Sequence, residues 1–209
     1  PTPSPPASYS YVLARHPRTY ATQVASQGLM YGTDMLLSLA LRAVPPPSAN
    51  RHMAVSNACA MAAAVGVGAR GEEGTALLVS AFLYAAFGGA VLAAGLGEGY
   101  GTTAALSLRG VGYGLSVVST SVLVNHAVRR EAYMPVAVSL FQTLTSAVAT
   151  ASPLGAAAAW KAATDARLPG QLLFDPPRLA FGLVGAASLL FAASLSRGWH
   201  RDAPPPSMV

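Results

Sequence analysis

Charge is what this sequence has least of. Its 209 residues include 13 basic and 8 acidic residues, 21 in all, whereas an average soluble chain of this length carries about 50 charged residues. So few charges would not keep the surface of a domain of this size in water. Hydrophobic residues make up 53% of the chain, and this content also excludes an intrinsically disordered protein.

Cysteine and aromatic residues are scarce as well. A single cysteine, Cys59, excludes an internal disulfide and any metal site built from several thiolates. The chain has 16 aromatic residues but 42 alanines and 20 glycines. Alanine and glycine make a weak core in water, but in a bilayer they let helix backbones approach closely. The composition therefore predicts an all-α protein, a multi-pass transmembrane helical bundle with small-residue packing.

Six apolar segments, separated by charged or Pro/Gly-rich breaks, follow the N-terminal region. A membrane span needs roughly 20 apolar residues to cross about 30 Å of hydrocarbon. By that measure four segments are long enough, and two shorter ones either cross or only dip into the bilayer, which predicts four to six spans. Pro153 predicts a kink or an early helix end near Ser152. The segments cover residues 22–43, 53–69, 75–97, 103–127, 134–160 and 179–196, of which 53–69 and 179–196 are the short ones.

The chain divides into a Pro-rich, basic extramembrane segment at 1–20, a transmembrane helical domain at 21–198 and a Pro-rich tail at 199–209. No acidic residue precedes Asp34, while several basic residues do. This composition is typical of an organellar import segment, although a short Pro-rich tail outside the membrane fits the first eight residues equally well. Basic residues are otherwise scattered in ones and twos, so nucleic acid is not an expected partner.

Small residues recur every four positions in two of the segments. This spacing places them on one helix face, where they allow either close packing inside the bundle or docking of a partner helix. We expect the two segments to contact each other or a partner through these faces. The residues are Ala81, Ala85, Gly89 and Ala93 in one segment and Gly110 and Gly114 in the other.

Asp34 and Arg109 are the charged residues expected inside the membrane. A charge within a span is costly and is a candidate functional residue for that reason. The two form a candidate intramembrane polar pair that could line a proton or solute route, with Gln142, His126 and Asn57 as further polar groups. In the alternative, Asp34 lies at the membrane interface or makes one structural bridge. Because nearly all other charges lie at segment ends, the sequence predicts too few polar groups inside for elaborate chemistry.

No catalytic, metal-binding or cofactor-binding residue emerges from the sequence. Metal or haem ligation needs a converging set of ligands, and the histidines lie singly near segment edges. The glycine-rich run at 95–101 lacks the residues and the strand context of a nucleotide loop. We therefore expect no cofactor and no enzymatic activity. The histidines are His16, His52, His126 and His200.

Residues 11–41 carry a resemblance to a known family. The stretch opens with an aromatic residue and a leucine before a His-Pro pair, and an apolar helix then reaches Gly32 and Asp34, with Thr33 between them. In this it resembles the N-terminal signature of the Mpv/PMP family, small four-helix proteins of peroxisomal and inner mitochondrial membranes. The opening matches are Tyr11, Leu13, His16 and Pro17.

A second part of that family's pattern, a Trp-Pro followed by Gln, is only partly present at 133–142, where Met134 replaces the tryptophan. The resemblance covers about thirty residues. It implies a membrane protein that acts as a poorly selective pore or as a membrane-integrity factor.

Two functions follow as expectations. The first is a non-catalytic accessory or structural subunit of a larger mitochondrial inner-membrane assembly, such as a respiratory complex or ATP synthase. It rests on small-residue helix faces, sparse chemistry and the import-like N-terminus, and its partners are membrane lipids and other membrane subunits. The second is a small Mpv/PMP-like channel or transporter for small solutes. The expected location is the mitochondrial inner membrane, with a peroxisomal or other organellar membrane as the alternative.

Overall fold

The computed structural model describes residues 8–41, 46–68, 74–93, 100–129, 131–165 and 176–199. These residues form seven helices and include no strand. A short first helix is followed by six long ones. The helices are α1 (Tyr9–Arg15), α2 (Pro17–Ala40), α3 (Pro46–Gly68), α4 (Gly74–Ala93), α5 (Tyr100–Val128), α6 (Met134–Asp165) and α7 (Pro176–Ser196).

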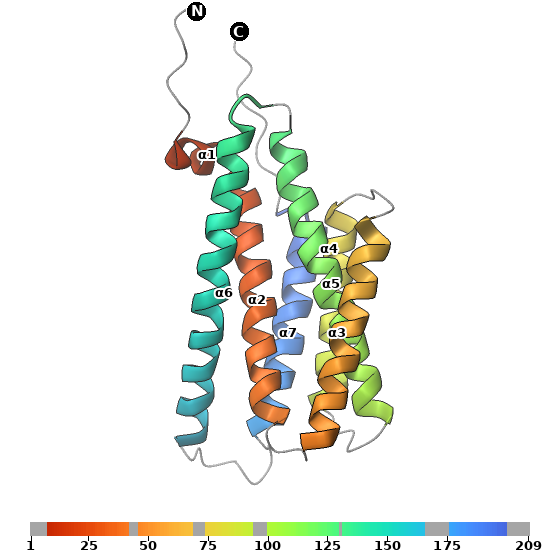
Figure 1. Ribbon diagram of the computed structural model, residues 1–209. Coiled ribbons are helices and arrows are strands. Elements are labelled where there is room, and N and C mark those ends of the chain that lie inside the picture. The colour runs from red at the N-terminus through yellow and green to blue at the C-terminus, as the bar shows by residue number, and fades with distance from the viewer. Residues whose placement is uncertain are drawn as a thin grey trace, which may run out of the picture.

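The six long helices run up and down in alternation and lie side by side in one bundle, while α1 lies across the end of the bundle beside α6 (Figure 1). The most extensive contacts join α5 to both α3 and α4, and α4 to α7. On the other side, α6 packs mainly against α2, and α2 in turn contacts α5 and α7. Helix α2 therefore joins α6 to the rest of the bundle.

Small residues set how closely the central helices approach. A methyl group built on Gly112 of α5 would lie 2.6 Å from the carbonyl oxygen of Ala81 in α4. One built on Gly89 would lie 3.1 Å from the backbone of Gly185 in α7. Side chains any larger would force these backbones apart, so the small residues determine the packing distance.

Three clusters of buried apolar side chains follow one another along the bundle axis. The first joins α1 and α2 to the facing ends of α5 and α6. The second joins α2, α4 and α7 and includes an edge-on contact between Phe82 and Phe191, whose ring centroids are 4.6 Å apart. The third includes Leu37, Leu106 and Phe181 at the other end of the bundle. The core is therefore continuous over the length of the bundle.

The outer surface of the bundle is strongly apolar. Large aliphatic side chains such as Met61, Val65 and Leu190 are more than 70% exposed, although water would favour their burial. Among the described residues, three helical stretches are long and apolar enough to cross a membrane: Gly74–Ala93, Gly101–Val128 and Met134–Ala162. The helix at Ala180–Ser196 is apolar but shorter. These features indicate an association with a membrane.

The helix bounds differ from the expected segments at several ends. Helix α3 begins at Pro46 rather than 53, α7 begins at Pro176 rather than 179, and α6 runs to Asp165 rather than 160. The first long helix begins at Pro17 rather than near residue 22, because proline is favoured at the first position of a helix. The expected early end near Ser152 is wrong, since α6 continues through Pro153 to Asp165. The expected segment ends at 42–43, 69 and 94–97 lie outside the described residues, as do the first seven residues and the tail beyond 199.

Candidate functional site

One face of α2 is both polar and buried. Its members follow the spacing of a helical face, with pairs three and four residues apart, which places them on one side of the helix. Each is at most 7% exposed, whereas apolar Val24 on the same helix is exposed. This arrangement reverses the order found in a water-soluble helix, whose polar face lies outside. We call this set the α2 polar stripe: Thr19, Thr22, Gln23, Ser26, Gln27 and Thr33.

Helix α5 places hydroxyl groups against the α2 polar stripe. The hydroxyls of Ser26 and Thr120 are 3.1 Å apart and share a buried hydrogen bond. Ser116 and Ser119 are buried on the same helix. The hydroxyls of Ser119 and Thr120 also donate to the carbonyl groups one turn earlier, at 2.6 Å each. The interface between α2 and α5 is therefore polar near its middle.

Helix α6 meets the stripe through its backbone. The amide nitrogen of Gln23 donates to the carbonyl oxygen of Phe141 at 2.8 Å and to the hydroxyl of Thr145 at 3.1 Å. One turn earlier, the Tyr20 hydroxyl donates to the carbonyl oxygen of Ala137 at 2.9 Å. These bonds fix the register of α2 against α6.

Four buried side-chain oxygen atoms in the described part of the chain have no hydrogen-bond partner. Three belong to the stripe: Oγ1 of Thr22 and the Oε1 atoms of Gln23 and Gln27. The fourth is Oγ of Ser188 in α7. An unpaired buried polar group costs about 1–3 kcal/mol, and most such groups in proteins are paired. Three of the four lie on one face of α2, which therefore holds an unusual number of unpartnered oxygen atoms.

A charged pair lies toward the other end of the same helix face. Nη2 of Arg109 is 2.8 Å from Oδ1 of Asp34 and 3.4 Å from the hydroxyl of Thr33. The Arg109 side chain is 7% exposed and that of Asp34 is 42% exposed. The pair therefore joins the buried stripe to the outer surface.

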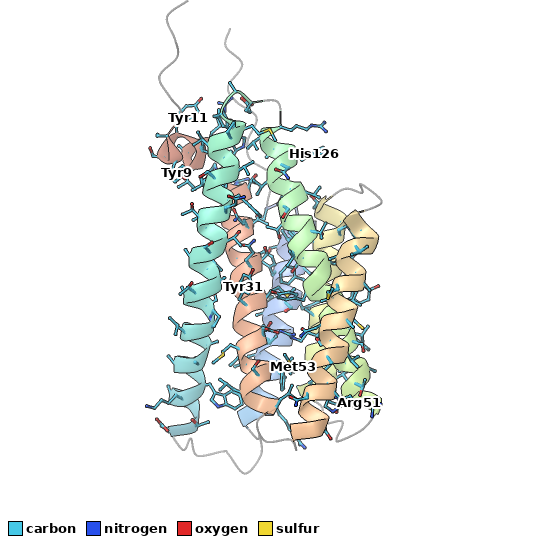
Figure 2. All side chains as sticks on the ribbon, viewed as in Figure 1. Tyr9, Tyr11, Tyr31, Arg51, Met53 and His126 are labelled. Atoms are coloured by element: carbon cyan, nitrogen blue, oxygen red, sulfur yellow. The ribbon has the colours of Figure 1, made fainter. Side chains whose placement is uncertain are left out.

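Two tyrosines flank the charged pair. Tyr31 and Tyr113 make an edge-on ring contact with centroids 6.2 Å apart, and Tyr113 lies near enough to interact electrostatically with both charges. Figure 2 shows Tyr31 part of the way along the bundle, well away from the end where Tyr9 and Tyr11 lie. Two aromatic rings thus border the place where the stripe reaches the surface.

The opposite end of the stripe meets α1 and the turn before α6, where Figure 2 shows Tyr9 and Tyr11. There, Nε2 of His16 and the Tyr133 hydroxyl are 2.8 Å apart. Burial, and then the negative charge of Glu131, raise the pKa of Tyr133 above its usual value. Its hydroxyl therefore keeps its proton at neutral pH and is able to donate to His16. Tyr9 is tied to α6 by a 2.6 Å hydrogen bond to Ser139.

The structure brings Asp34 and Arg109 together, but not the three other polar groups named from the sequence. Asn57, His126 and Gln142 are exposed on the outside of α3, α5 and α6. Because these side chains are exposed, they do not belong to the buried α2 polar stripe.

The small-residue faces pack inside the bundle in an arrangement that the sequence does not indicate. Ala81 and Ala85 of α4 meet Gly112 of α5, while Gly89 meets Gly185 in α7. The two glycines of α5 named from the sequence pack against a different helix. Gly110 contacts the backbone of Ser56 and Gly114 that of Ala60, both in α3. Ala93 is half-buried beside the third apolar cluster.

The bundle buries more polar groups than the count of charges indicates. Beyond the charged pair, a whole face of α2 and parts of α5 and α7 bury hydroxyl and amide groups. Serine, threonine and glutamine carry no charge, so an inventory of charges overlooks them. Their position on one helical face between Thr19 and Thr33 is the signal that identifies them.

Other candidate ligands do not converge. His52 is buried and its Nδ1 lies 3.4 Å from the Thr103 hydroxyl, and Cys59 is a half-buried free thiol. Among the residues that the structure describes, no three His, Cys, Asp or Glu side chains lie close enough to hold a metal ion.

The hydrogen bond of Tyr20 supports a stability prediction. Replacing Tyr20 with phenylalanine leaves the Ala137 carbonyl oxygen without this donor, which costs about 1 kcal/mol. We expect the apparent Tm in detergent to fall by about 2–4 °C. Tyr84→Phe, at an exposed position of α4, is the control and leaves Tm unchanged. Equal values for both variants would show that the Tyr20 bond contributes nothing.

Comparison with protein-family models, with curated proteins and with solved structures finds no match.

Proposed function

We propose that the protein is a membrane-embedded channel or transporter for small solutes, with the α2 polar stripe as its route. The observation that supports this most directly is the set of four unpartnered oxygen atoms along the stripe and on Ser188. Polar side chains often join helices inside membranes, and such joints satisfy their hydrogen bonds. A route for a polar solute needs groups that are still able to accept a bond.

The proposal includes more spans than the three helices named above. We infer that α2, α3 and α7 cross the bilayer too, giving six crossings. Each packs along a neighbour that is long and apolar enough to span: α2 along α6, α3 along α5, and α7 along α4. With 24 residues, α2 extends about 36 Å, which exceeds the hydrocarbon thickness of about 30 Å.

The pair of Asp34 and Arg109 has a specific place in this proposal. A guanidinium that is only 7% exposed is held by a carboxylate that still reaches the surface. A solute entering from that side meets Asp34 before it meets the stripe. Asp34 therefore acts as the polar entrance, and Arg109 keeps its charge balanced.

The test is solute flux through the purified protein in lipid vesicles. Vesicles containing the wild-type chain are expected to take up a small solute faster than empty vesicles, and Asp34→Asn is expected to change the rate or the selectivity. Ser146→Ala, at an exposed position of α6, is the matched control and leaves flux unchanged. Flux that is identical in Asp34→Asn and wild type would remove Asp34 from the route.

A second candidate is an accessory subunit of a larger assembly, for which the mitochondrial inner membrane is the proposed location. It is favoured by an open apolar groove of about 890 Å³ between α4 and α7. Small residues form much of the lining, which suits the close approach of another transmembrane helix. The groove is lined in part by Ala86, Phe87, Ala90, Gly182, Gly185 and Leu189.

Extraction in mild detergent, followed by native electrophoresis and mass spectrometry, separates the two candidates. An accessory subunit migrates with its partner proteins in one large complex. Migration only as a monomer or a small homo-oligomer would contradict the accessory-subunit candidate and would be consistent with the channel or transporter.

A further inference from the structure

We propose that the α2 polar stripe selects uncharged solutes that donate hydrogen bonds through hydroxyl groups, and that it excludes ions. This inference rests on the proposed function and specifies the class of solute. Water and small polyols share the chemistry concerned, since both offer O–H donors and carry no charge.

The first argument is the chemistry of the unpartnered atoms. Oε1 of Gln23 and Oε1 of Gln27 are amide oxygens, which only accept hydrogen bonds. The hydroxyls of Thr22 and Ser188 both accept and donate. A molecule satisfied by these four groups must therefore bring donors. An anion brings none to the amide oxygens and is repelled by them.

The second argument is the charge along the route. Arg109 is paired with Asp34, and the other charged residues of α2, α5, α6 and α7 within the described ranges lie in the first or last five residues of their helices. An ion that leaves water for this interior would find no countercharge, and that transfer is costly. Neutral oxygen atoms hold a cation only when several surround it, whereas the unpartnered oxygen atoms of the stripe all come from one helix.

The third argument is spacing. Gln23 and Gln27 are one helical turn apart on α2, so their side chains lie about 5–6 Å from each other. Thr22 is adjacent to Gln23. Ser188 is one turn from Ala192, which packs in the same cluster as Met30 of α2. The three acceptors of α2 thus succeed one another along the stripe, at steps that a small hydroxylated molecule can follow.

The experiment uses the full chain in vesicles and measures several permeabilities by light scattering and ion-sensitive dyes. The probes are water under a sucrose gradient, glycerol, K⁺ and Cl⁻. We expect water, glycerol or both to cross at least about tenfold faster than in empty vesicles, with K⁺ and Cl⁻ at the level of empty vesicles. The permeabilities to water and to glycerol show which of these two solutes the stripe accepts.

Gln27→Leu tests the stripe itself. Loss of one acceptor on the route is expected to lower the permeability to the uncharged probe by about tenfold, because the free energy of one hydrogen bond corresponds to a change of about that size. Gln142→Leu makes the same change at an exposed position of α6 and leaves permeability unchanged. If Gln27→Leu does not elute as a folded monodisperse protein, Thr22→Val replaces it, with the same expected direction.

The outcomes separate this inference from the proposed function. If no probe crosses faster than in empty vesicles, the channel or transporter itself is refuted. If K⁺ or Cl⁻ crosses as fast as glycerol, the route exists but the selection of uncharged donors is wrong. Permeability that is unchanged in the stripe variant would place the route elsewhere in the bundle.

Discussion

Replacing Gly114 with valine is expected to separate α3 from α5 and to cost the protein about 3 kcal/mol or more. Gly114 lies against the backbone of Ala60, and Gly110 lies against that of Ser56 one turn away. A side chain there meets a backbone carbonyl and not the flexible end of another side chain, so local repacking cannot relieve the contact. Overpacking costs about 1–3 kcal/mol where neighbours can move. The measurement is the apparent Tm in detergent, with cross-linking between α3 and α5.

Two other glycines provide matched controls for this prediction. Gly66 on α3 and Gly155 on α6 have no atom within 4 Å of the position that a side chain would take. Gly155→Val and Gly66→Val are expected to leave Tm near the wild-type value, because valine suits a helix no worse than glycine does. A loss of stability in Gly114→Val no larger than in these two would show that the close approach of α3 and α5 is unimportant.

Removing Asp34 is expected to destabilise the protein more than removing Arg109. Arg109 is the buried partner of the pair and Asp34 is 42% exposed. Asp34→Ala leaves a buried guanidinium unpaired, which costs about 3 kcal/mol, the lower end of the range for breaking a buried ion pair. Arg109→Leu leaves a carboxylate that can still be solvated at the surface, and we expect a loss of about 1 kcal/mol.

The double variant completes this test. When both charges are removed, no unpaired charge stays inside the bundle, so Asp34→Ala with Arg109→Leu is expected to be more stable than Asp34→Ala alone. Unfolding by denaturing detergent measures all four proteins. Additive losses in the double variant would mean that the two side chains do not interact, contrary to their distance of 2.8 Å.

Much of the fold can be predicted from the sequence, because long apolar segments and the charged or Pro-rich breaks between them indicate helices directly. The positions of the helix ends are harder to predict, because they depend on single residues such as proline. Pro17 begins α2 earlier than hydropathy suggests, and Pro153 is tolerated inside α6. The side of each helix that faces a neighbour depends on the rotation of both helices. For this reason the contacts of Gly110 and Gly114 with α3 could not be predicted.

The candidate site is predictable only in part. Asp34 and Arg109 stand out because a charge in an apolar segment is costly. The α2 polar stripe does not stand out by hydropathy, since Ser, Thr and Gln change a segment average little. Its partners come from α5 and α6, and the hydrogen bond from Gln23 to Phe141 joins residues 118 positions apart. No local pattern identifies such a partner.

That same separation in sequence has a consequence for biosynthesis. At about 5–20 residues per second, the ribosome needs roughly 6–24 s after Gln23 to reach Phe141, and Thr120, which pairs with Ser26, lies 94 residues beyond it. For most of this interval the polar face of α2 has neither α5 nor α6 to pack against. With α2 as a membrane span, as proposed above, the insertion machinery has to shelter this helix from lipid until the later helices are made.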